Sequence, residues 1–102
     1  MIQLTLLGAT GSIGQSTLDI VARHRDRYAV YALTANDRHE KMHELCRRFE
    51  PRYAVMSDAA SARLLADAVA DLNTEVLSGE AELAEVAAAA EVDTVVAGIV
   101  GA

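Results

Sequence analysis

The chain has few of the residues that stabilise or anchor secreted and membrane proteins. Its 102 residues include one cysteine, one proline and no tryptophan. A single cysteine excludes an intramolecular disulfide and a metal site made of cysteines. No apolar run approaches the roughly 18 residues of a membrane-spanning helix, and the N-terminus lacks the basic and then apolar arrangement of a signal peptide. We therefore expect a soluble, cytoplasmic protein that does not bind a membrane.

Positive charge is also scarce. Lysine and arginine total 9 against 15 aspartates and glutamates, which gives a formal net charge of -6. This balance argues against nucleic-acid binding, which usually needs a basic face. It does not exclude a phosphate ligand, because backbone N–H groups at a helix N-terminus bind anions without net positive charge. Hydrophobic residues make up 52% of the chain, enough for the core of one small domain.

Short apolar runs alternate with segments of helical period along the whole chain. The runs are rich in β-branched residues, which favours strands. We expect five strands, at residues 2–7, 28–34, 53–56, 75–77 and 94–100.

Four helices are expected between these strands because apolar residues recur there with helical spacing. Pro51 ends the second helix, since proline disfavours the helical conformation of the residue before it. Ser57 or Asp58 is expected to cap the third helix, and Ser78 or Gly79 the fourth. The expected apolar faces are Ile13, Thr17, Ile20, Val21 and His24; Met42, Leu45, Cys46 and Phe49; Leu65, Ala68, Val69 and Leu72; and Leu83, Val86, Ala87 and Ala90.

Strand–helix alternation predicts an α/β fold with right-handed crossovers. We expect a Rossmann-like, doubly wound parallel sheet in three layers, with strand order 4-3-2-1-5. Ligands in such sheets bind at the carboxyl ends of the strands, where the strand order reverses. A buried fifth strand needs a further helix to cover it, and none follows in this sequence. We therefore expect residues 1–102 to be the N-terminal part of a longer protein.

The stretch GATGSIG at residues 8–14 lies between the first expected strand and the first expected helix. Glycine allows a ligand to approach the backbone closely, and the helix that follows offers free N–H groups and the positive end of its dipole. Thr10 and Ser12 add hydroxyl donors. The spacing G-x-x-G-x-x-G departs from the dinucleotide fingerprint G-x-G-x-x-G but serves the same purpose. The alternative is a tight turn that binds no ligand.

The stretch LTANDRHEK at residues 33–41 follows the second strand. In dinucleotide-binding folds an acidic residue here holds the adenosine ribose, whereas a basic residue accommodates a 2′-phosphate. Asp37 alone suggests NAD, but Arg38, His39 and Lys41 favour NADP, so residue types leave the choice open. The alternative is a solvated loop in which Asp37 caps the second helix.

Other reactive side chains carry no site of their own. His39 and His43 have the i, i+4 spacing of metal ligands but lack a third ligand nearby, and Cys46 lies on an apolar face as a core residue. No catalytic arrangement is found, so we predict neither catalytic nor metal-binding residues. Three interpretations remain: an enzyme's cofactor domain, a non-catalytic nucleotide-sensing Rossmann domain, and an α/β domain without a ligand.

Four stretches together resemble the 1-deoxy-D-xylulose 5-phosphate reductoisomerase family: QLTLLGATGSIGQSTLDIV, PRYAVM, TEVLSG and VDTVVAGIVGA, at residues 3–21, 51–56, 74–79 and 92–102. The resemblance implies an NADPH-binding domain of a cytoplasmic, homodimeric enzyme. Such enzymes isomerise and reduce 1-deoxy-D-xylulose 5-phosphate to 2-C-methyl-D-erythritol 4-phosphate in non-mevalonate isoprenoid biosynthesis. They also need Mg or Mn, whose ligands, like the residues that bind the phosphorylated sugar, would lie beyond residue 102.

The resemblance also implies roles for residues at the expected site. Asp37 departs from the family, which often has a lysine or arginine there, so Arg38 or His39 would have to supply the contact with the 2′-phosphate. The implied assignments are Thr10, Gly11, Ser12 and Ile13 at the cofactor phosphates, Asn36, Asp37 and Arg38 at the adenosine ribose and 2′-phosphate, and Ala97, Gly98 and Ile99 at the nicotinamide side.

Overall fold

A computed structural model describes residues 1–97 of the chain. Strands and helices alternate throughout, as expected. None of the helices in the described part is long and apolar enough to cross a membrane. The elements are β1 (Ile2–Leu7), α1 (Ser12–Arg23), β2 (Tyr28–Ala35), α2 (His39–Phe49), β3 (Tyr53–Met56), α3 (Ala59–Ala68), β4 (Glu75–Ser78), α4 (Glu80–Ala88) and β5 (Thr94–Ala97).

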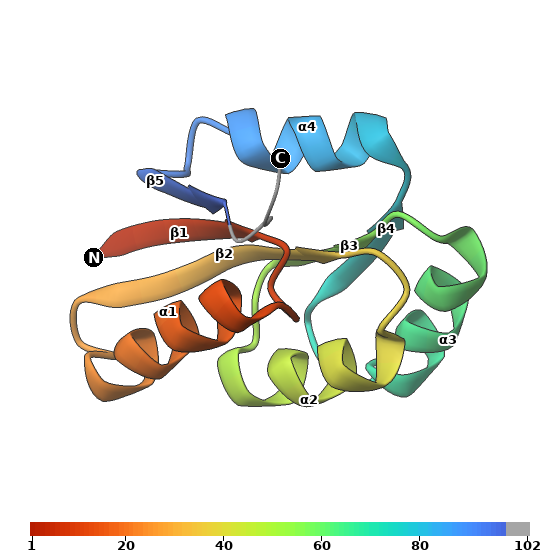
Figure 1. The fold of residues 1–102 in the computed structure, drawn as a ribbon, viewed down its shortest axis with the longest axis horizontal. Coiled ribbons are helices and arrows are strands. Elements are labelled where there is room, and N and C mark those ends of the chain that lie inside the picture. Colours follow the sequence, from red (N-terminus) through yellow and green to blue (C-terminus); the bar gives the residue numbers. More distant parts are fainter. Residues whose placement is uncertain (98–102) are drawn as a thin grey trace.

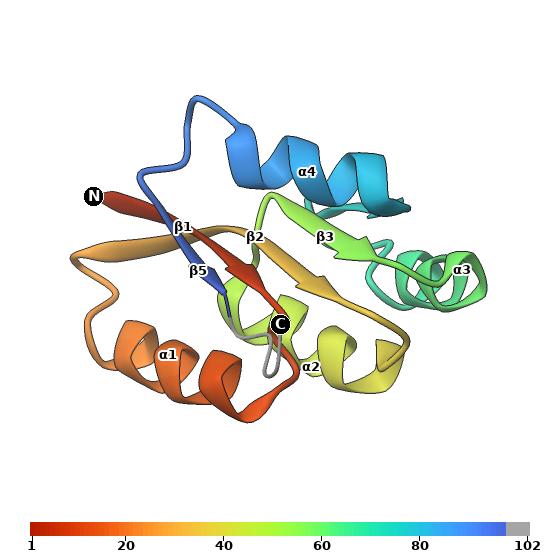
Figure 2. The same ribbon diagram turned by 45° about the horizontal axis from the view of Figure 1, so that its top comes forward.

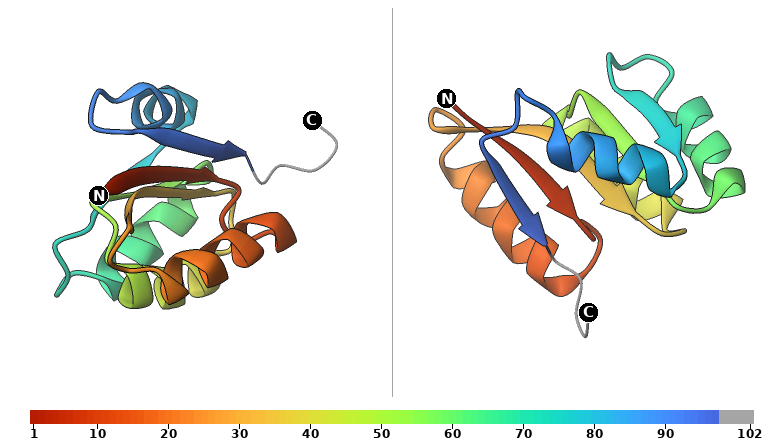
Figure 3. Two further views of the ribbon diagram at one scale, coloured as in Figure 1. Left: turned by 90° about the vertical axis from the view of Figure 1, so that its left-hand side faces the viewer. Right: turned by 90° about the horizontal axis from the view of Figure 1, so that it is seen from above.

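All strands pair in parallel, in the order β4-β3-β2-β1-β5. Helices α1, α2 and α3 cover one face of the sheet and α4 covers the other (Figure 1; Figure 3). The α/β class, the doubly wound parallel sheet, the three layers and the strand order are therefore confirmed. Only the end of the fifth strand, predicted to continue over 98–100, lies outside the described residues.

Two apolar clusters hold the layers together. The larger one joins the sheet to α1, α2 and α3 and includes Leu6, Leu18, Leu33 and Leu65. The smaller one joins the sheet to α4, and its buried members are Tyr31, Ala32, Val55 and Val86. Alternate residues of a strand point to opposite faces, so β2 and β3 contribute to both clusters.

The predicted apolar face of α1 is wrong in part. The buried residues of α1 are Gly14, Leu18 and Val21, whereas Ile13 and Ile20 are 45% and 54% exposed. The buried side of the helix includes Gly14, whose missing side chain lets the helix backbone come near residues 8 and 9. Only Val21 of the predicted face is buried.

The expected helix boundaries are confirmed. Helix α2 ends at Phe49, and Glu50, which precedes Pro51, adopts a left-handed conformation with φ of 45°. At the N-terminus of α3, the Asp58 carboxylate accepts a hydrogen bond from the Ser61 N–H. Gly79 is the N-cap residue of α4.

The register between β1 and β2 shifts by one residue along their length. Leu4 pairs with Val30 but Thr5 pairs with Ala32, so Tyr31 is an extra residue of β2. The extra residue makes this irregularity similar to a β-bulge. The consecutive residues Tyr31 and Ala32 therefore both belong to the smaller cluster, on the α4 side of the sheet. The shift also sets which residues beyond it in β2 face α4.

Candidate functional site

The carboxyl ends of β1, β2 and β5 meet at one edge of the sheet, with β1 between the other two strands. Figure 2 shows the chain leaving β1 at this edge and turning into α1. Strands β2, β3 and β4 lie to one side of β1 and β5 lies to the other, so this is the position where the strand order reverses. The stretch GATGSIG and Ala97, both predicted to lie at a cofactor, are at this edge.

The first part of the site is the turn of residues 8–11, here called the glycine turn. Gly8 has a φ of 75°, a left-handed conformation that glycine adopts without steric cost. The Gly11 N–H donates a hydrogen bond to the Gly8 carbonyl at 3.1 Å, which closes the turn. The Ala9 side chain is fully buried in the larger core cluster. The turn is thus attached to the core and is not a loose surface loop.

Gly14 allows α1 to pack directly against the glycine turn. A Cβ atom at this position would lie 2.7 Å from the Ala9 carbonyl oxygen and 2.8 Å from both the Ala9 Cα and the Gly8 carbonyl oxygen. These neighbours are backbone atoms that no side-chain rotation can remove. The three glycines therefore have separate tasks: Gly8 permits the turn, Gly11 begins the helix, and Gly14 allows close packing.

The N-terminus of α1 offers unpaired backbone donors. Gly11 is its N-cap residue, and no side chain caps the helix. The Gln15 N–H is the first intrahelical donor, to the Gly11 carbonyl at 3.0 Å, so the N–H groups of residues 12–14 have no acceptor within the helix. Thr10 is half-buried, while Ser12 and Ile13 are exposed. The predicted phosphate-binding residues, Thr10 to Ile13, therefore lie together where the helix dipole favours an anion.

The second part of the site is the turn of residues 36–38, which follows β2. Asn36, Asp37 and Arg38 are all exposed. Two contacts from the start of α3 support their backbone. The Asp58 N–H donates to the Asn36 carbonyl at 3.1 Å, and the Ser61 hydroxyl shares its single proton between the Asp58 carboxylate at 2.6 Å and the Asp37 carbonyl at 3.2 Å. The side chains are thus free to meet a ligand while the backbone is held.

Asp37 does not cap α2, contrary to one of the alternatives for this stretch. The N-cap residue is Arg38, and no side chain caps this helix. Residues 37–41 line a shallow pocket of about 290 Å³. It contains the cations Arg38 and Lys41, of which Lys41 forms an exposed ion pair with Glu44 at 3.5 Å. This end of the site combines positive side chains with an uncapped helix N-terminus.

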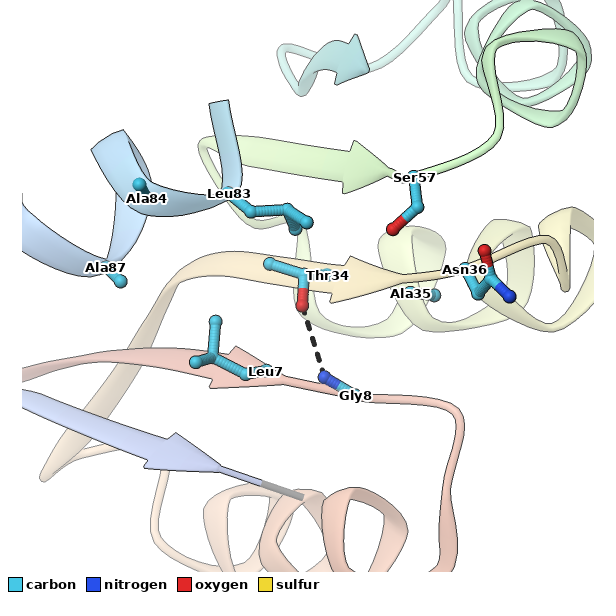
Figure 4. A pocket seen from close by; sticks show the side chains of 9 residues that line it. All are labelled: Leu7, Gly8, Thr34, Ala35, Asn36, Ser57, Leu83, Ala84 and Ala87. Carbon is cyan, nitrogen blue, oxygen red and sulfur yellow. Dashed lines mark hydrogen bonds between the residues drawn. The ribbon is translucent and has the colours of Figure 1, made fainter. Parts of the chain in front are cut away.

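A pocket of about 430 Å³ connects the two turns on the α4 side of the sheet (Figure 4). Its size falls within the range of small-molecule sites. Sequence reasoning found only Gly8 and Asn36 among its residues, because the helical pattern of α4 does not reveal which strands the helix crosses. The pocket is lined by Leu7, Gly8, Thr34, Ala35, Asn36, Ser57, Leu83, Ala84 and Ala87.

The third predicted group is only partly described. Ala97 ends β5 and pairs with Leu7 of β1, directly before the glycine turn. Gly98 and Ile99, also predicted at the cofactor, lie outside the described residues.

Two further kinds of reactive side chain occur in the described part of the chain, the single cysteine and residues of the types that bind metals. Cys46 is completely buried, and burial raises the pKa of its thiol to about 12, which keeps it protonated and unreactive at neutral pH. Among residues 1–97 no three histidine, cysteine, aspartate or glutamate side chains are grouped so as to hold a metal ion.

Known proteins of high similarity share both sequence and fold with this chain. The 1-deoxy-D-xylulose 5-phosphate reductoisomerase from Stutzerimonas stutzeri is 59% identical over 103 residues, which cover 99% of this chain and 26% of the relative. The enzyme of the same name from Nitrosospira multiformis is 61% identical over 97% of this chain. The chain thus spans about a quarter of the length of the curated relatives it matches.

Solved structures of enzymes with the same name have the same fold as this chain. A crystal structure of DOX-P reductoisomerase in complex with NADPH, fosmidomycin and magnesium superposes with a TM-score of 0.87 and 41% identity, over 93% of this chain and 24% of that one. A Zymomonas mobilis enzyme in complex with NADPH superposes with a TM-score of 0.80 over 84% of this chain and 23% of that one. The family model described as 1-deoxy-D-xylulose 5-phosphate reductoisomerase matches residues 4–102. The chain therefore belongs to the 1-deoxy-D-xylulose 5-phosphate reductoisomerase family.

Proposed function

We propose that residues 1–102 form the NADPH-binding domain of a longer enzyme. That enzyme isomerises and reduces 1-deoxy-D-xylulose 5-phosphate to 2-C-methyl-D-erythritol 4-phosphate in non-mevalonate isoprenoid biosynthesis. The observation that carries the proposal is the uncapped N-terminus of α1 directly behind the closed glycine turn. NADPH is present in two of the structures that superpose on this chain. Family membership favours this enzyme domain over a nucleotide sensor.

The glycine turn fits a cofactor pyrophosphate. In the proposal, the backbone N–H groups of Ser12 and Ile13 and the hydroxyls of Thr10 and Ser12 hold the phosphates, which approach the backbone closely at Gly11. The exposed side chain of Ile13 covers the cofactor on its outer side. NADPH supplies a hydride for the reduction step, and this chain contributes binding and orientation.

The turn of residues 36–38 would hold the adenosine ribose and its 2′-phosphate. We assign the contact with the 2′-phosphate to Arg38, because Asp37 repels a phosphate and Arg38 stands beside it at the uncapped start of α2. Asn36 and Asp37 would contact the ribose hydroxyls. Ala97, Gly98 and Ile99 would lie along the nicotinamide side.

The remaining chemistry is assigned to the part of the enzyme beyond this chain. Magnesium is present in the superposed structure that also holds NADPH and fosmidomycin, whereas residues 1–97 group no set of metal ligands. In the proposal, the Mg or Mn ligands and the site for the phosphorylated sugar follow residue 102. The intact enzyme would act as a cytoplasmic homodimer.

Cofactor titration of the intact protein that contains this chain tests the proposal. We expect NADPH to bind at least about tenfold more tightly than NADH, because an arginine–phosphate contact is a charge-assisted hydrogen bond. Isothermal titration calorimetry measures both constants. Equal or tighter binding of NADH would contradict the assignment to NADPH, and absence of binding by either cofactor would contradict the proposed function.

A further inference from the structure

Thr34 contacts the glycine turn through two different atoms. Its side-chain oxygen Oγ1 accepts a hydrogen bond from the Gly8 N–H at 3.1 Å (Figure 4). Its backbone carbonyl accepts a hydrogen bond from the Ala9 N–H at 2.8 Å. Two successive N–H groups of the turn are therefore directed toward β2. We propose that Thr34 is a positioning residue for cofactor binding, which fixes the glycine turn in the conformation that receives the phosphates.

The side chain of Thr34 adds something that the backbone cannot. Any residue at position 34 would keep the carbonyl bond to Ala9, but only a hydroxyl-bearing side chain of this length reaches the Gly8 N–H. Thr34 is 3% exposed, so water does not readily replace its hydroxyl. Without Oγ1, a partly buried N–H would lose its acceptor, and Gly8, with its φ of 75°, would have one anchor fewer.

Thr34 also joins the two ends of the candidate site. It immediately precedes Ala35, the last residue of β2, after which the turn of residues 36–38 begins. It lines the connecting pocket together with Leu7 and with Leu83 of α4. The register shift at Tyr31 brings Thr34 onto this face, since a shift of one residue exchanges the faces to which side chains point. Thr34 thus contacts the glycine turn directly and lies one residue from the start of the turn of residues 36–38.

This inference rests on the proposed NADPH binding, and the substitution Thr34→Val tests it in the intact protein. Valine keeps the shape of threonine but removes the acceptor. We expect the dissociation constant for NADPH to rise about three- to tenfold, in line with the usual contribution of one hydrogen bond. Thr34→Ser restores the hydroxyl and should bring the constant back to within about twofold of the wild type.

Thr5→Val is the matched control. Thr5 is also completely buried in the sheet and faces α4, where its hydroxyl donates to the Val86 carbonyl at 3.1 Å. Both valine variants should lower the melting temperature, but Thr5→Val should leave the NADPH constant unchanged. A Thr34→Val variant that binds NADPH like the wild type overturns the inference, as does an equal loss of affinity in Thr5→Val.

Amide hydrogen exchange separates this inference from the proposed function. Thr34→Val should accelerate exchange at the Gly8 N–H about threefold or more relative to the same group in Thr5→Val, with or without cofactor. If the wild type binds no NADPH, the proposed function fails. The positioning of the turn by Thr34 is then judged by exchange alone, and unchanged exchange at Gly8 overturns it.

Discussion

The glycine turn and the turn of residues 36–38 lie at the same edge of the sheet but are held in different ways. The glycine turn is fixed by buried backbone contacts: Ala9 belongs to the core, and Gly14 leaves no room for a single added carbon. The turn of residues 36–38 is exposed and is supported by hydrogen bonds from the start of α3. We infer that cofactor binding depends on the backbone shape of the glycine turn and on the side-chain charge of the turn of residues 36–38.

Gly14→Ala should have the largest effect, because it acts on the shape of the glycine turn. The new Cβ would lie 2.7 Å from a backbone oxygen, so α1 and the turn must move apart. We expect a loss of about 1–3 kcal/mol in the free energy of unfolding, the usual cost of overpacking, and NADPH binding weakened by more than tenfold. Urea denaturation and cofactor titration measure the two effects.

Ser16→Ala is the control for Gly14→Ala. Ser16 is an exposed residue of the same helix, and alanine is a good helix former, so this variant should keep both stability and affinity. Normal NADPH binding by Gly14→Ala would show that the turn tolerates displacement, and the contrast between the two turns would be lost.

Arg38→Ala should have an intermediate effect on NADPH affinity, and the effect should be confined to the turn of residues 36–38. Arg38 is exposed and its side chain does not cap α2, so its removal leaves the fold unchanged. We expect NADPH binding to weaken about tenfold, the order expected for one charge-assisted hydrogen bond, and NADH binding to change less than about twofold. Titration with both cofactors at low and high salt measures this, and the loss should diminish at high salt.

Arg63→Ala provides the matched change in net charge. Arg63 is an exposed cation on α3, outside the 36–38 turn and the pocket lining. Its removal should leave the ratio of NADPH to NADH affinity intact. An equal effect of the two arginine variants would indicate that net charge, and not Arg38 itself, governs the choice of cofactor.

Asp58→Ala should have the smallest effect and a distinct pH dependence. Hydrogen bonds from the Ser61 hydroxyl and N–H hold the pKa of Asp58 below its ordinary value of 3.8. A carboxylate with a lowered pKa in the folded state stabilises the fold above its unfolded pKa, and this stabilisation is lost as the pH falls through the folded value. The variant should therefore be less stable than the wild type at neutral pH, with the difference vanishing in acid.

Thermal unfolding between pH 2 and pH 7 checks the effect of Asp58, with Asp67→Ala on the exposed side of the same helix as control. NADPH affinity should stay close to that of the wild type, because the variant keeps the bond from the N–H of residue 58 to the Asn36 carbonyl and leaves the Ser61 hydroxyl available to the Asp37 carbonyl. A difference in stability that persists in acid would contradict the role of the ionised cap.

Much of this architecture was predictable from local patterns. Alternating apolar runs and helical segments predicted the parallel sheet, and the strand order expected for such a fold is confirmed. Pro51, Asp58 and Gly79 marked helix boundaries that the structure also confirms. The face of α1 was not predictable from hydrophobicity, because Ile13 and Ile20 have the spacing of core residues while Gly14, which has no side chain, marks the side that packs most closely. The assignments of individual residues to NADPH stay predictions.

The sequence by itself determined where the turns occur, since glycine, proline and capping residues act through the conformation of their own backbone. Only the tertiary structure decided that Thr34 meets Gly8 and that Leu83 and Ala87 of α4 complete the pocket. These contacts join residues that are far apart in the chain. They depend on the one-residue register shift between β1 and β2 and on where α4 crosses the sheet, and packing of the whole domain selects both.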